Sequence, residues 1–164
     1  MKRILCCITL LIVLIALPTI QAQPVTGSFS FTLRGYTVHG RIINAIIHND
    51  TTVTATMLVN DYLQAPLGGV AITGSGEWHG TLNGTTLVGQ VENVAGIAHP
   101  CIFFIFCGHA DYIGEGTWTG TLSGTQGSGT FTGEITFTDS SFSQIPVNKP
   151  NTVSGTWDST FQIS

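Results

Sequence analysis

Charged side chains are scarce in this sequence of 164 residues, of which only 9% are Asp, Glu, Lys or Arg. Beyond residue 22 the basic side chains are Arg34, Arg41 and Lys149, against nine carboxylates, which gives that part a net charge of −6. A surface that binds nucleic acid needs a basic stripe to neutralise phosphates. We therefore predict that nucleic acid is not a partner.

Long apolar runs are also lacking, with one exception at the N-terminus. Lys2 and Arg3 precede an apolar block over 4–17, and Ala22 follows. This order is typical of a secretory signal peptide, and the block is shorter than the about 20 residues that a membrane helix needs. We predict cleavage after Ala22, a single mature domain over 23–164 with no transmembrane span, and a product that is secreted or held at the cell surface. An uncleaved membrane anchor is the alternative.

The common catalytic motifs are absent as well. There is no Gly-x-Ser-x-Gly, no His-Glu-x-x-His and no phosphate-binding loop. Glu77 and His79 share one face of a predicted strand, and Asp111 and Glu115 flank Tyr112. Paired carboxylates can hydrolyse glycosides when they lie about 5–9 Å apart across a cleft. We predict no catalytic residues and no cofactor, and keep an extracellular hydrolase as a third alternative.

A repeated strand pattern is the most abundant feature that the sequence does contain. The segments 74–82, 114–122 and 127–135 read GSGEWHGTL, GEGTWTGTL and GSGTFTGEI, and SGTWDSTFQI near the C-terminus is a degenerate fourth copy. In each copy glycines and large apolar residues alternate with polar residues, most of which are Thr, Ser or Glu. A period of two with one apolar face is typical of half-buried antiparallel strands.

The tryptophans of these copies, Trp78, Trp118 and Trp157, each follow a glycine by two residues. A glycine inside a strand leaves bare backbone that a ring from a neighbouring strand can cover. We therefore interpret the repeated Gly-x-Trp as core packing. The pattern predicts an all-β, single-domain fold with a meander of about 8–10 short strands, either an antiparallel β-sandwich or an up-and-down β-barrel.

Two N-glycosylation sequons begin at Asn49 and Asn83. Both fall in predicted hairpin turns, at Asn49-Asp50 and at Asn83-Gly84, whose residue types suit tight turns. An acceptor asparagine there would be exposed, so both are candidate modification sites.

The run HPCIFFIFCGH, over 99–109, carries the clearest chemical hint. As one straight strand at about 3.3 Å per residue it would hold Cys101 and Cys107 about 20 Å apart, whereas a disulfide needs Cα atoms within about 4.4–6.8 Å. The run is therefore either a buried strand or a loop closed by a disulfide, which an oxidising compartment favours. A third interpretation is a metal site with His99, Cys101, Cys107 and His109 as ligands.

A disulfide would turn the residues between the cysteines into a knob or a plug. Those residues are Ile102, Phe103, Phe104, Ile105 and Phe106. Because a charge-poor surface favours association, the leading hypothesis is an exported, non-catalytic β-domain with a structural, self-assembly or adhesion role at the cell surface. Its contact loop would touch a second copy or another surface protein. The alternative is a β-barrel that binds a small apolar ligand, with Ile102–Phe106 as the lid.

Overall fold

The period-two pattern forms ten β-strands in a computed structural model of the chain, which describes residues 25–65, 68–103 and 105–164. The predicted signal peptide lies outside the described residues. The strands are β1 (Val25–Leu33), β2 (Tyr36–Ile47), β3 (Thr52–Ala65), β4 (Gly68–Asn83), β5 (Thr86–Ile102), β6 (Phe106–Cys107), β7 (Ala110–Ser123), β8 (Gln126–Ser140), β9 (Pro150–Thr160) and β10 (Gln162–Ile163).

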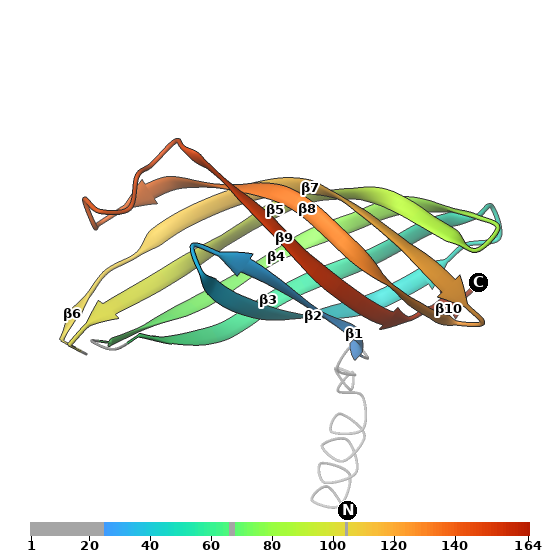
Figure 1. Cartoon of the computed structure of the whole chain (residues 1–164), viewed down its shortest axis with the longest axis horizontal. Coiled ribbons are helices and arrows are strands. Elements are labelled where there is room, and N and C mark those ends of the chain that lie inside the picture. The colour runs from blue at the N-terminus through green and yellow to red at the C-terminus, as the bar shows by residue number, and fades with distance from the viewer. Residues whose placement is uncertain (1–24, 66–67, 104) are drawn as a thin grey trace, which may run out of the picture.

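Eight of these strands form one closed antiparallel barrel (Figure 1). Each of β1, β2, β3, β4, β5, β7, β8 and β9 pairs with the next, and β9 pairs back with β1. The short β6 pairs with β5, and β10 lies parallel to β2. The predicted all-β fold is therefore confirmed, and of its two forms the structure has the up-and-down barrel. Among the described residues, no helix reaches the length and apolarity that a membrane crossing requires.

The barrel strands are longer than predicted, at 9 to 17 residues each. Asparagine is a residue type that is common in turns, but two asparagines lie inside strands, at β-bulges. Asn44 has φ 53° where the register of β2 with β3 shifts, and Asn93 has φ 53° where that of β5 with β7 shifts. A bulge places one extra residue in a strand without ending it, which bends the wall of a barrel.

Hairpin turns lie at both ends of the barrel. Gly84-Thr85 and Gly124-Thr125 close one end, together with the turn over 48–51. Gly84 has φ 62° and is the first turn residue, so this turn begins one residue later than predicted, and Asn83 closes β4. Asn49 and Asn83, the two candidate glycosylation sites, are both exposed.

That closed end is filled by three tryptophans, and we call it the tryptophan end (right in Figure 1). Trp78 stacks on Trp118 with ring centroids 5.0 Å apart, and Trp157 meets both edge-on at 5.3 and 5.6 Å. The Trp118 ring, on β7, lies across Gly89 on the adjacent β5 and Gly80 on the next strand, β4. The predicted packing of aromatic rings over glycines is therefore confirmed.

Candidate ligand-binding site

The opposite end of the barrel, which we call the open end, is hollow. It carries the Arg34-Gly35 turn, the hairpin between β5 and β6, and the loop over 141–149. A cavity of about 260 Å³ lies inside it, and a void of about 40 Å³ lies deeper. The inward faces of the strands supply an almost wholly apolar lining, which includes Phe31, Leu33, Leu63, Val70, Ile72, Ala98, Ile135 and Phe137.

The inner wall of the cavity contains one buried hydroxyl. Tyr112 on β7 is 6% exposed, and its hydroxyl donates a hydrogen bond to the carbonyl oxygen of Thr73 at 3.1 Å. Burial raises the pKa of Tyr112 to about 12, because the charged phenolate would lose its hydration. The Tyr112 side chain is therefore neutral at physiological pH, and its hydroxyl group already donates a hydrogen bond to Thr73.

One side of the cavity lies where two wall strands diverge. The pairing of β2 with β3 ends at Gly40 and Val59, although β2 begins at Tyr36 and β3 continues to Ala65. The carboxylate of Asp61 accepts hydrogen bonds from the backbone N–H groups of His39 at 2.7 Å and Tyr62 at 2.8 Å. These bonds give partners to backbone groups on the segments of β2 and β3 that do not pair with each other. Tyr36 and Leu63, from the diverging segments, both line the cavity. The hollow therefore extends to this split in the wall.

Arg34 is the one basic residue on the cavity lining. It has φ 51° in the turn between β1 and β2, and its guanidinium carbon lies 5.8 Å from the ring centroid of Phe137. Its Nε donates a hydrogen bond to Oδ1 of Asn151 at 3.0 Å. The sequence-based prediction did not include Arg34, although it is one of only three basic residues beyond residue 22.

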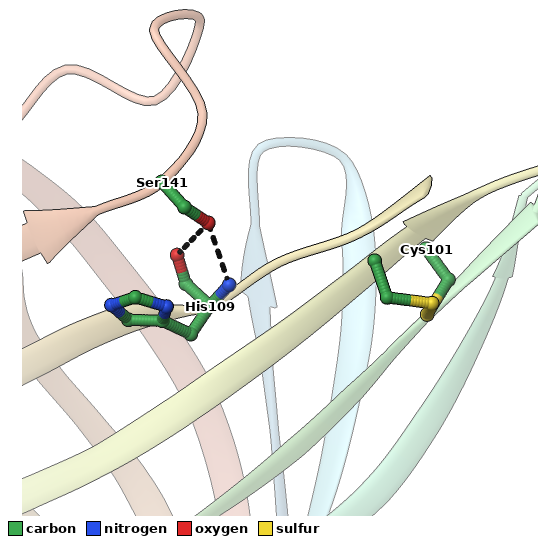
Figure 2. The surroundings of a disulfide bond; sticks show 4 residues. Cys101, His109 and Ser141 are labelled. Atoms are coloured by element: carbon green, nitrogen blue, oxygen red, sulfur yellow. Dashed lines mark hydrogen bonds between the residues drawn. A yellow bond between two sulfur atoms is a disulfide. The ribbon is translucent and has the colours of Figure 1, made fainter. Parts of the chain in front are cut away.

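Cys101 and Cys107 form a disulfide at the tip of the open end, with Cα atoms 4.0 Å apart (Figure 2). They face each other as a cross-strand pair of β5 and β6, and Ile102 pairs with Phe106. The run over 99–109 therefore begins as strand and then turns back as a hairpin. The tip is exposed, at 56% for Phe103, 78% for Ile105 and 67% for Phe106, so it is not the buried strand that was the alternative to a disulfide-closed loop. Phe104 lies outside the described residues.

The disulfide removes both thiolates that the metal-site interpretation requires. His99 lies exposed on β5, and the Nε2 atom of His109, which directly precedes β7, is 3.3 Å from Oδ2 of Asp139. Ser141 exchanges two hydrogen bonds with the backbone of His109, as Figure 2 shows. Within the described ranges, no three His, Cys, Asp or Glu side chains come together as a metal site.

The proposed lid does not reach the cavity. None of the described residues within Ile102–Phe106 lines it, although Pro100 does, just before the disulfide. From the loop over 141–149, Ile145 reaches the cavity. The sequence could not indicate this, because Ile145 comes close to the cavity only after β8 and β9 have paired.

All four glutamates lie in one row on the outer face. Glu77 on β4 pairs with Glu92 on β5, and Glu115 on β7 pairs with Glu134 on β8. Asn93 donates a hydrogen bond to Glu77 at 2.9 Å, which, with help from His79, lowers the pKa of that carboxyl. These carboxylates lie side by side on the exposed outer wall, where Glu92 and Glu115 also line one surface hollow.

These features define a class of protein: an up-and-down β-barrel that is packed with tryptophan at one end and hollow and apolar at the other. No protein-family model, curated protein or solved structure matches the chain.

Proposed function

We propose that the protein binds a small apolar molecule in the cavity at the open end of the barrel. The observation that supports this is the hollow itself, about 260 Å³ in volume and lined by apolar side chains. Protein interiors are normally close-packed, and an unfilled cavity costs stability in proportion to its volume. An apolar cavity stays dry and accepts an apolar guest of matching size. The cost of leaving this space unfilled is offset when a ligand fills it.

The size of the cavity limits the ligand. At about 30 Å³ for each water-sized group, about 260 Å³ holds roughly nine groups. This is slightly below the range of about 300–1,000 Å³ that is usual for ligand pockets. The ligand is therefore a short chain or a single ring system and not a large lipid.

The protein performs this role outside the cytoplasm and without catalysis. The order of residues at the N-terminus supports export, and a disulfide is most persistent in an oxidising compartment. An exported barrel of this kind carries or captures its ligand in solution or at the cell surface.

Filling the cavity tests the proposal. Ala98 lies on the inward face of β5, is 7% exposed and lines the cavity. We expect the wild type to bind octan-1-ol, whose nine heavy atoms match the space, and Ala98→Phe to weaken that binding at least tenfold in calorimetric titration, because the new ring occupies the same volume. The control is Ala95→Phe, an exposed position on the outward face of the same strand, which should bind as the wild type does. A wild type that binds no octan-1-ol, or a folded Ala98→Phe that binds it equally well, contradicts the proposal.

A second function, self-assembly or adhesion to another surface protein, is supported by the disulfide-closed tip. Phe103, Ile105 and Phe106 are large, apolar and more than half exposed, and contiguous exposed apolar residues mark interaction sites. The disulfide and the cross-strand pair of Ile102 with Phe106 hold them in one place. A rigid apolar knob loses little conformational entropy when it docks.

Replacing the tip by polar residues tests this second function. We expect the wild type to form oligomers in size-exclusion chromatography with light scattering, and the double variant Phe103→Ser, Phe106→Ser to be monomeric with an unchanged far-ultraviolet spectrum. A matched control removes two exposed apolar residues elsewhere, Val88→Ser with Ile163→Ser, and should still associate. A monomeric wild type, or equal association by both double variants, would show that the tip is not an assembly surface.

A further inference from the structure

The rim of the cavity carries a cation that no carboxylate neutralises. Within the described residues the side-chain contacts of salt-bridge length are His79 with Glu77 and His109 with Asp139, so Arg34 has no acidic partner there. We propose that the ligand is an amphiphile with a carboxylate head group, which the Arg34 guanidinium binds at the rim while the apolar chain fills the cavity. This inference rests on the proposed ligand-binding function and adds the chemical class of the ligand.

The guanidinium is held in place with most of its donors free. Its Nε donates to Oδ1 of Asn151, and Asn151 is itself fixed because its Nδ2 donates to the carbonyl oxygens of Ile135 at 3.2 Å and Lys149 at 3.1 Å. Among the described residues the terminal nitrogens, Nη1 and Nη2, make no hydrogen bond. These nitrogens form the planar fork that binds a carboxylate through two parallel hydrogen bonds. The contact with Phe137 uses the face of the cation and leaves that fork free.

The place of Arg34 matches an amphiphile that lies across the rim. Arg34 and Phe137 both line the cavity, so a head group at the guanidinium has an apolar lining directly below it. The net charge of the whole chain is −4 and would repel an anion at long range. Attraction must therefore be local, at the Arg34 guanidinium, because Lys149 contacts Asn151 only through its backbone carbonyl oxygen. Arg34 therefore selects ligands by their head group, whereas the apolar lining of the cavity selects them by their tail.

Asp61, whose carboxylate also lies at the open end of the barrel, does not compete with a ligand for Arg34. Both of its oxygens accept backbone N–H groups, from His39 and from Tyr62, at the split between β2 and β3. Asp139 is likewise engaged with His109. The Arg34 fork therefore has no acidic competitor within ion-pair reach among the described residues, and an incoming carboxylate displaces only water.

Two probes with the same number of carbon atoms test the inference: octanoate and octan-1-ol, titrated calorimetrically against the wild type, Arg34→Gln and Arg41→Gln. The Arg34→Gln side chain can still hydrogen-bond Asn151 but has no charge. Arg41 is exposed on β2, where it pairs with Ser28 and Leu58 and does not line the cavity, so Arg41→Gln is a control of equal charge change. We expect Arg34→Gln to weaken octanoate binding tenfold or more, as loss of a charge-assisted pair does, and to change octan-1-ol binding less than twofold. Arg41→Gln should change neither.

The outcomes separate this inference from the function on which it rests. If octan-1-ol and octanoate bind the wild type equally, or if Arg34→Gln binds octanoate as the wild type does, the cavity binds apolar ligands but Arg34 does not recognise a head group. If Arg41→Gln weakens octanoate as much as Arg34→Gln, the effect is one of net charge and the inference also fails. If neither probe binds the wild type, both the inference and the cavity function are overturned.

Discussion

Trp118→Ala should lower the free energy of unfolding by about 3–5 kcal/mol, the range for large aromatic truncations in a core. The ring is 1% exposed, stacks on Trp78 and meets Trp157 edge-on. It also covers Gly80 and Gly89, which have no side chains to refill the space. The tryptophan end can therefore collapse only partly around the deletion. Urea unfolding followed by far-ultraviolet circular dichroism measures the loss.

The neighbouring residue provides the matched control for this prediction. Thr119 points outward from the same strand and is exposed, so Thr119→Ala should cost less than about 0.5 kcal/mol. Its carbonyl oxygen accepts the hydrogen bond from Trp157, and the substitution leaves that backbone atom in place. Similar losses from the two variants would mean that the inward face of β7 is assigned incorrectly.

Stability should fall steeply with pH above pH 10, and Tyr112 should account for about 2 kcal/mol of the loss by pH 12. Burial raises the pKa of Tyr112 from 10.0 to about 12 in the folded protein. Between these values the unfolded chain releases the phenol proton and the folded chain keeps it. The stabilisation is therefore complete below pH 10 and is lost as pH rises toward 12, at about 1.4 kcal/mol for each unit of pKa difference.

Tyr112→Phe isolates this contribution from every other group that titrates in alkali. The variant removes the hydroxyl that donates to Thr73, so its stability at neutral pH is expected to differ from that of the wild type. What matters is the slope of unfolding free energy against pH between 9 and 12, measured in urea, which should be shallower in the variant by about 2 kcal/mol over that interval. Parallel curves would mean that the Tyr112 phenol is not desolvated.

Much of this fold could be predicted from the sequence because its determinants are local. Alternation around Trp78, Trp118 and Trp157 is repeated along the chain and assigns the inward face directly. Barrel and sandwich could not be distinguished, since both use the same alternation and differ only in whether the first and last strands meet. Here β1 pairs with β9, so the sheet closes. Ile163 shows where local reasoning fails: alternation from Trp157 along SGTWDSTFQI places it inward, but it is 67% exposed, because the strand is interrupted at Phe161 and β10 pairs with β2.

The candidate site could be predicted only in part. The Cys101–Cys107 disulfide was the favoured one of the alternatives that the sequence left open, because these are the two cysteines beyond residue 22 and the expected compartment is oxidising. No local sequence pattern indicates the cavity, because it arises where the side chains of seven strands and a loop together fill too little of the interior. Arg34 and Ile145 are far apart in the sequence and meet the same hollow only through the register of the closed barrel.

The division of the barrel into a packed end and a hollow end also bears on how the protein can evolve. Substitutions at separated sites have nearly additive effects on stability, and the tryptophans lie at the end opposite to the cavity. Side chains such as Val70, Ile72 and Ala98 can therefore change in size or shape without unfolding the protein. The packed tryptophans at the other end supply the stability that offsets the cost of such changes. Selection can redirect the preference of the hollow end from one guest to another, step by step, in a chain that stays folded throughout.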